Sequence, residues 1–99
     1  MRYKVQIFPT AETDLLEIRS YFEEVLKVSA DSLIDKFYDA LKPLSETPFM
    51  HPLVQDDVLA RKEFHFLVVD NYIVFYKIRE NVVQIYRFIY GRRMTSSLL

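Results

Sequence analysis

Six basic side chains near the end of the sequence are the residues best suited to chemistry. They are Arg61, Lys62, Lys77, Arg87, Arg92 and Arg93. Arginine grips phosphate groups through paired, charge-assisted hydrogen bonds. Tyr86, Phe88 and Tyr90 lie beside these cations in the sequence, and aromatic rings stack on bases. The pattern predicts a phosphate-binding surface or an anchor for a partner peptide laid over the rings, with a solvated strand end as the plain alternative.

Histidines and carboxylates are weaker candidates. His51 and His65 have no further ligands at metal-binding spacing, so we expect neither a metal site nor a cofactor. His65 stands in an apolar run and should be a packed residue, whereas His51 should be a loop residue. The acidic residues of the first helical segment should be solvated surface charges. They are Glu12, Asp14, Glu17, Glu23 and Glu24.

Composition predicts one cytoplasmic domain spanning residues 1–99. Hydrophobic residues make up 51% of the 99-residue chain and aromatic residues 15%, more than disordered chains carry. The sequence has no cysteine and no apolar run long enough to cross a membrane. Charge is uneven: residues 1–57 hold 6 Lys/Arg and 11 Asp/Glu, a net of −5, whereas residues 58–99 hold 7 and 3, a net of +4. The basic half could attract a nucleic acid or an acidic protein segment.

The segment from Arg61 to Arg93 predicts three antiparallel strands. Its runs are rich in Val, Ile, Phe and Tyr, and Asp70-Asn71 and Glu80-Asn81 interrupt them as tight turns. Two-residue turns fix the register. The expected cross-strand pairs are Val69 with Tyr72, Leu67 with Val74, His65 with Tyr76, Ile78 with Val83, and Tyr76 with Ile85.

Alternation along these strands gives the sheet two apolar faces, and each needs a cover. The first face is expected to carry His65, Leu67, Val69, Tyr72, Val74, Tyr76, Ile78, Val83, Ile85 and Ile89. The second face is expected to carry Phe64, Phe66, Val68, Ile73, Phe75, Tyr86, Phe88 and Tyr90, with Lys62, Lys77 and Gln84. The rest of the chain can cover one face, so we expect a partner to cover the second.

The first half of the sequence predicts a strand and two helices. Residues 2–8 alternate as a strand, and apolar spacing predicts a helix from Ala11, capped by Thr10, and another from Ala30, capped by Ser29. Pro43 should kink or end the second helix. Residues 47–57 should form a loop, and residues 94–99 a frayed tail or short turn. The predicted fold is therefore α+β, in the order β-α-α-β-β-β, with a helical hairpin on one face of an antiparallel sheet.

The ordered series of these segments resembles the RelE/ParE superfamily of toxins from bacterial type II toxin–antitoxin pairs. The resemblance spans nearly the whole chain. It is carried by Pro9-Thr10-Ala11-Glu12-Thr13-Asp14-Leu15, by Leu41, Leu44 and Pro48, by Tyr72-Ile73-Val74-Phe75-Tyr76-Lys77-Ile78, and by Ile85-Tyr86-Arg87-Phe88-Ile89-Tyr90-Gly91-Arg92-Arg93. It implies a growth inhibitor held silent by a cognate antitoxin that covers the exposed aromatic face. The implied antitoxin contacts are Phe64, Phe66, Phe75, Tyr86, Phe88 and Tyr90.

Two targets follow from the resemblance. RelE-like members cleave ribosome-bound mRNA with basic strand residues, whereas ParE-like members poison DNA gyrase. Arg93 stands where the ribonucleases use an arginine, but Ile73 stands where they carry another, and Phe64 and Phe66 stand where some carry lysines. Cleavage requires one group to hold the phosphate and another to protonate the leaving oxygen. These departures favour the ParE-like branch, which acts by protein contact without catalysis.

Three hypotheses therefore stay open. The favoured one is a gyrase-directed toxin with Arg92 and Arg93 contacting the target. The second is an mRNA interferase, an endoribonuclease whose candidate catalytic residues are Arg93, Arg61, Lys62, His65 and Arg87. The third is a degenerate member that binds its antitoxin without being toxic.

Overall fold

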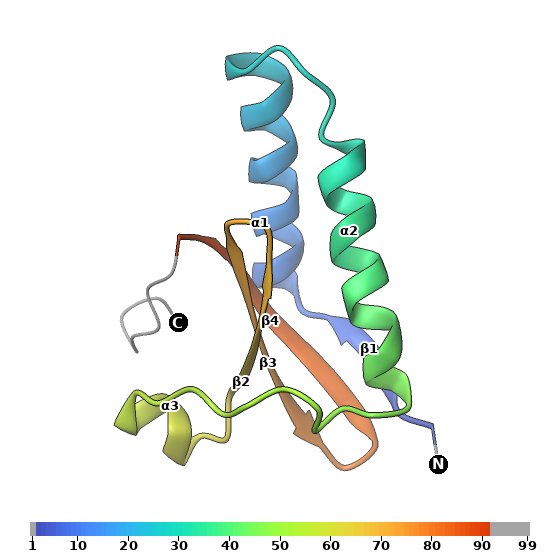
Figure 1. The fold of residues 1–99 in the computed structure, drawn as a ribbon, viewed down its shortest axis with the longest axis vertical. Helices are drawn as coiled ribbons and strands as arrows, with labels where there is room; N and C mark the ends of the chain where they lie inside the picture. Colours follow the sequence, from blue (N-terminus) through green and yellow to red (C-terminus); the bar gives the residue numbers. More distant parts are fainter. Residues whose placement is uncertain (1, 92–99) are drawn as a thin grey trace.

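A computed structural model describes residues 2–91 of the chain. A helical hairpin lies on one face of a four-stranded sheet, which confirms the predicted α+β class (Figure 1). The elements are β1 (Lys4–Ile7), α1 (Pro9–Ser20), a π-helical turn (Tyr21–Val25), α2 (Asp31–Leu41), a 3₁₀ turn (Lys42–Ser45), α3 (Asp57–Arg61), β2 (His65–Val69), β3 (Tyr72–Arg79) and β4 (Val82–Tyr90). The expected tail 94–99 and the candidates Arg92 and Arg93 lie outside the described residues.

The predicted meander is confirmed in order and register. β2 pairs antiparallel with β3, and β3 with β4, through the five residue pairs expected from the turns. Asp70 and Glu80 supply the positive φ of the two turns, at 53° and 55°. The second turn thus places the left-handed backbone conformation on Glu80. This conformation costs glutamate more conformational free energy than it costs Asn or Asp.

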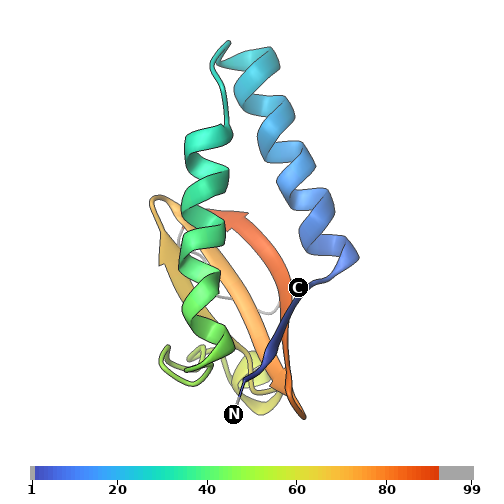
Figure 2. The ribbon, with the colours of Figure 1, turned by 90° about the vertical axis from the view of Figure 1, so that its right-hand side faces the viewer.

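β1 corrects the expectation of a purely antiparallel sheet. The strand order is β1-β4-β3-β2, and β1 runs parallel to β4, with Lys4 beside Val82 and Ile7 beside Ile85. The connection between these parallel strands runs through the helical hairpin, α3, β2 and β3, so it is long enough for the crossover that parallel pairing requires. Figure 2 shows β1 along the edge of the sheet below the hairpin. The last strand of the meander therefore lies inside the sheet, between β1 and β3.

The helix boundaries follow from local chemistry. α1 begins at Pro9, whose missing N–H costs nothing in the first turn. Thr10 does not cap it as expected; its hydroxyl donates to the Tyr86 carbonyl oxygen at 2.9 Å. The Ser29 hydroxyl oxygen accepts a hydrogen bond from the Asp31 N–H at 3.1 Å. Because α2 begins at Asp31, Ser29 lies one residue before the N-cap position, which Ala30 occupies. α2 ends before Pro43, as predicted, and a 3₁₀ turn follows.

A β-bulge in β4 reverses the predicted faces near the end of the strand. Tyr76 pairs with Ile85 and Phe75 with Arg87, so Tyr86 is an extra residue. Beyond it, Phe88 points into the core beneath the helices, where its ring centroid lies 4.8 Å from that of Phe37. The assignments of Phe88 and Tyr90 to the second face and of Ile89 to the first were wrong, because unbroken alternation was assumed through the bulge.

Candidate functional site

Part of the second face is covered by the chain itself. Val54 and Leu59, each 1% exposed, pack on Phe64, Ile73 and Phe75. The segment before α3 also bonds to the sheet edge, where the Val54 N–H donates to the Phe64 carbonyl oxygen at 2.8 Å. α3 begins at a side-chain cap, because Asp56 accepts from the Val58 and Leu59 N–H groups.

This cover corrects the expectation of an open aromatic face. Of the implied antitoxin contacts, Phe64, Phe75 and Phe88 are at most 4% exposed and touch the chain's own core. Phe66 and Tyr86 are half-buried, and Tyr90 is 70% exposed. Residues 47–57 were predicted as a loop because they show no periodicity, and the short helix α3, with its anchor Leu59, was not predicted. Arg61 and Lys62, expected to begin a strand, instead end α3 and follow it.

An apolar groove opens on the first face, between the far half of the helical hairpin and the end of β3 and β4. Its volume is about 780 Å³. Tyr21, Phe22 and Leu26 form the helical wall, and Tyr72 and Tyr90 form the sheet wall. Tyr21 is 51% exposed and Leu26 is 45% exposed, so their apolar surface faces water. The Tyr72 and Tyr90 ring centroids lie 5.3 Å apart.

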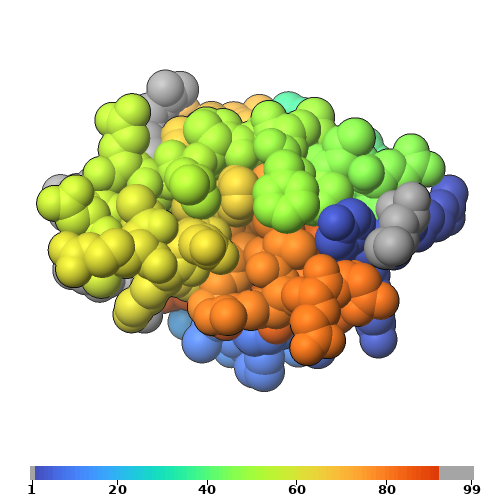
Figure 3. All heavy atoms as spheres, turned by 90° about the horizontal axis from the view of Figure 1, so that it is seen from below, coloured from blue at the N-terminus to red at the C-terminus, as the bar shows by residue number. Residues whose placement is uncertain are grey.

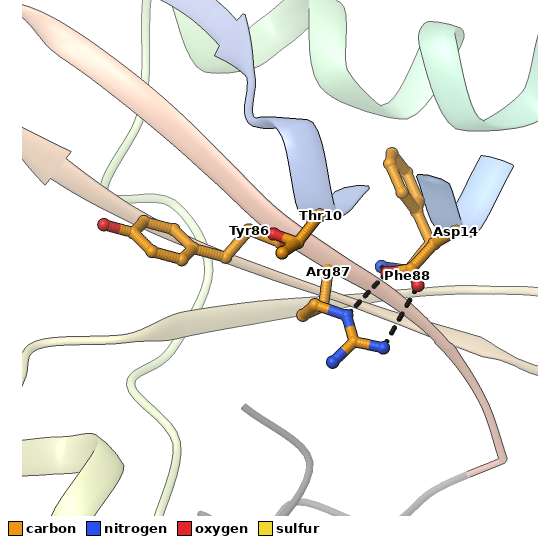
Figure 4. Close-up of polar contacts among 5 residues, drawn as sticks. All are labelled: Thr10, Asp14, Tyr86, Arg87 and Phe88. Atoms are coloured by element: carbon orange, nitrogen blue, oxygen red, sulfur yellow. Dashed lines mark hydrogen bonds and ion pairs between the residues drawn. The ribbon is translucent and has the colours of Figure 1, made fainter. Parts of the chain in front are cut away.

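A partly buried ion pair between Asp14 and Arg87 lies at the inner end of the groove (Figure 4). Arg87 Nε donates to Asp14 Oδ2 at 2.7 Å, and its Nη2 donates to Oδ1 at 3.1 Å. The Phe88 N–H donates to Oδ2 as well, at 3.0 Å. Asp14 is 7% exposed, so the expectation that it is a solvated charge was wrong. The hydrogen bond to Asp14 raises the pKa of Arg87 and outweighs the lowering effect of burial.

His65 belongs to a buried cluster that holds the loop after α2. Its ring stacks on Tyr76, with centroids 5.3 Å apart, and its Nδ1 lies 2.8 Å from the His51 carbonyl oxygen. Tyr76 donates its hydroxyl to the Pro48 carbonyl oxygen at 2.9 Å, and burial raises its pKa to about 12. Burial and the nearby His65 lower the pKa of His51. His65 is thus a packed residue, as its apolar strand predicted.

The four described residues of the expected ribonuclease set are not brought together. Arg87 is paired with α1 on the first face, whereas Lys62 lies near Lys77 on the second. His65 is buried and Arg61 is exposed on α3. Within residues 2–91, no three His, Asp or Glu side chains gather as a metal site. In the same residues, no helix has the length and apolar character needed to cross a membrane.

Sequence reasoning missed two kinds of residue. The groove residues Tyr21 and Leu26 lie off the apolar stripe of the first helix, and that excess apolar surface was a usable signal. Lys4 and Arg79 were also missed. Lys4 joins Lys77 on the second face only because β1 pairs with β4, which no local pattern indicates. Arg79 lies two residues after Lys77 on β3, so alternation along that strand was a usable signal.

These features define an α+β domain with a helical hairpin packed on a mixed sheet. The same fold occurs in the structure titled chromosomal ParDE toxin–antitoxin system from P. aeruginosa, with a TM-score of 0.73, 14% identity, and coverage of 92% of this chain and 98% of that one. It also occurs in the toxin–antitoxin complex RelBE2 from Mycobacterium tuberculosis, with a TM-score of 0.62, 19% identity, and coverage of 91% and 99%. A comparison with curated protein sequences found no match.

The family assignment comes from the sequence. Residues 5–95 match the family model described as ParE toxin of type II toxin-antitoxin system, parDE. The chain therefore belongs to the ParE toxin family, within the superfamily that the sequence resemblance indicated.

Proposed function

We propose that this chain is a growth-inhibiting toxin that a cognate antitoxin silences by binding the groove on the first face. The observation that carries the proposal is the exposed apolar wall of that groove. Tyr21, Leu26 and Tyr90 are 51%, 45% and 70% exposed. An amphipathic helix buries such surface by laying its apolar side into a groove. The matched structures are titled as toxin–antitoxin assemblies, which supports a partner of this kind.

The charges around the groove favour a partner segment with both acidic and apolar side chains. Lys36 forms one rim, paired with Asp70 at 3.2 Å, and its side chain is 56% exposed. Exposed ion pairs of this kind contribute little to stability and exchange partners readily. A carboxylate of the partner can therefore reach Lys36 while apolar side chains of the partner cover Tyr72 and Tyr90.

We further propose that the toxin acts by protein–protein contact, with DNA gyrase as its target. The family assignment supports this choice. The geometry speaks against the ribonuclease alternative, because Ile73 is fully buried on the second face, where the resemblance implies an arginine. We retain Arg92 and Arg93 as proposed target contacts. The remaining proposed antitoxin contacts from the original set are Tyr90, in the groove, with Phe66 and Tyr86.

The test is a supercoiling assay with purified gyrase and purified toxin. We expect supercoiling to be inhibited at micromolar toxin, and an Arg92→Ala/Arg93→Ala variant to inhibit less. A matched variant, Lys27→Ala/Lys42→Ala, removes the same charge from the helical layer and should inhibit fully. Unchanged supercoiling together with cleaved mRNA in induced cells would establish the ribonuclease alternative. Normal growth with soluble protein present would establish the degenerate one.

A further inference from the structure

Four cations occupy the part of the second face that α3 leaves open. Val82 of β4 pairs with Arg79 of β3 on one side and with Lys4 of β1 on the other. In the next row of the same face, Gln84 pairs with Lys77 and with Gln6. Val5 and Val83 pack into the core beneath the helices, so alternation turns Lys4 and its row toward the second face. Lys62 follows α3 and lies close enough to affect the charge of Lys77. We call Lys4, Lys62, Lys77 and Arg79 the basic patch.

The basic patch lacks the ion pairs found elsewhere in the molecule. Among residues 2–91, ion pairs use the cations Arg2, Arg19, Lys36, Lys42 and Arg87, and none uses a patch residue. The pKa of Lys77 is lowered, first by burial and then by Arg79 and Lys62, while Glu63 opposes the shift. Like charges gathered without paired carboxylates destabilise the free protein. An anionic partner would remove that repulsion.

Aromatic rings beside the patch hold a lysine, and their faces are not open for base stacking. Lys77 Nζ lies 5.1 Å from the Phe64 ring centroid and 5.3 Å from that of Tyr86, both within cation–π range. Phe8 packs on Tyr86 at 4.8 Å, and Phe64 is 4% exposed. Single-strand binders need open rings on which bases stack. Here the rings position a cation, which points to recognition of charge and not of bases.

We propose that the basic patch binds the phosphate backbone of duplex DNA. The patch spans three adjacent strands and the end of α3, and Figure 3 shows α3 (yellow) beside the exposed end of β3 and β4 (orange) on this surface. Its lysines and arginine, with the amide of Gln6, are the side-chain types that contact phosphates. Duplex DNA offers the dense, rigid array of negative charge that matches cations fixed on a sheet. The inference goes beyond the proposed function and does not rest on it.

A salt titration tests this proposal. Binding of a labelled mixed-sequence duplex of roughly 20 base pairs is followed by fluorescence anisotropy from about 50 to about 200 mM salt. Four phosphate contacts predict a slope of about −3.6 in log K against log salt, and Lys62→Gln/Lys77→Gln/Arg79→Gln should reduce it to about −0.9. Lys62→Gln/Arg79→Gln changes exposed residues only and should give about −1.8. Lys62→Arg/Arg79→Lys keeps both positive charges and should bind duplex DNA as the native protein does.

The matched control is Lys27→Gln/Lys36→Gln/Lys42→Gln, which changes net charge equally in the helical layer and should leave the slope unchanged. Equal losses in both triple variants would overturn the proposal, because binding would then follow net charge alone. Tighter binding to single-stranded RNA of equal length, or to poly-glutamate, would also overturn it. So would the absence of duplex binding at the lowest salt concentration with folded protein, as judged by circular dichroism.

Discussion

The two faces of the sheet are covered by different means. Two helices cover the first face. They are joined to it by a core that includes Phe37 and Phe88, and by the partly buried ion pair of Asp14 and Arg87. On the second face, one short helix and an extended segment cover only one end through Val54 and Leu59. Each cover is incomplete in its own way: the first leaves an apolar groove, and the second leaves a basic patch. The difference shows that one small sheet can present two surfaces of opposite chemistry.

The largest expected effect comes from a charge placed in the second face. Phe75 is fully buried, so Phe75→Glu buries a carboxylate without a partner and should cost more than about 4 kcal/mol of unfolding free energy. Circular dichroism and denaturant unfolding measure it. Phe49→Glu, at a residue 64% exposed, is the control and should keep its fold. A folded Phe75→Glu protein would show that α3 does not close this face.

The ion pair of the first face is expected to come next. Asp14→Ala leaves Arg87 and the Phe88 N–H without the carboxylate that bonds both, at a cost of about 3 kcal/mol. Urea unfolding of this variant is compared with that of Glu12→Ala, an exposed change in the same helix. A loss below about 0.5 kcal/mol, typical of surface changes, would mean that the pair does not join α1 to β4.

Replacing the apolar anchor of α3 sharpens the comparison between the two covers. Leu59→Ala should cost about 2–3 kcal/mol, because a side chain that is 1% exposed leaves a cavity. Val58→Ala, at a neighbour that is 42% exposed, should change stability by less than about 0.5 kcal/mol. Hydrogen exchange of β2 and β3 should rise in the first variant only. Equal stability of both variants would contradict the packing described for the second face.

A substitution in the groove should weaken antitoxin binding and leave the stability of the fold nearly unchanged. Tyr90→Asp, at a residue 70% exposed, should weaken antitoxin binding by about tenfold or more while unfolding changes little. Isothermal titration with the cognate antitoxin measures it. Tyr38→Asp, on α2 but outside the groove and 46% exposed, is the matched control. Equal weakening by both changes would place the antitoxin elsewhere.

The smallest expected effect concerns pH and the cluster around His65. Burial raises the pKa of Tyr76 from 10.0 to about 12, so folding favours the protonated hydroxyl. The associated stability is complete below pH 10 and is lost at up to about 1.4 kcal/mol per pH unit as pH rises toward the folded pKa. Tyr76→Phe should abolish this loss and cost about 1 kcal/mol at neutral pH. Urea midpoints between pH 8 and about 11 measure both; a variant with the native slope would rule out Tyr76 as the source.

Local patterns predicted the strands, the turns and the helical hairpin because each depends on near neighbours. Asp70 and Glu80 fixed the register through turns, and Pro43 marked the end of a helix. The bulge at Tyr86 could not be predicted, since one extra residue in a strand leaves no mark on an alternating apolar sequence. Its effect on the candidate site was large: it moved Phe88 to the core and placed Arg87 beside Asp14.

The remaining errors concern contacts between distant segments. Asp14 looked like one of five surface carboxylates until β4 brought Arg87 against it. The place of Lys4 in the basic patch depends on β1 lying parallel to β4. The cover on the second face depends on Val54 and Leu59, two isolated apolar residues in and before the short helix α3. Such contacts are set by tertiary packing, which overrides local preference.

The position of β4 also constrains how the chain is made. This strand is the last described one in the sequence, yet β1 and β3 flank it and α1 is tied to it. Asp14 and Arg87 are 73 residues apart, so their contact closes a long loop. On a translating ribosome, the sheet is incomplete until β4 has left the exit tunnel, and neither the finished groove nor the basic patch exists before then. Synthesis of this polypeptide therefore has a built-in delay before its surfaces can meet any partner.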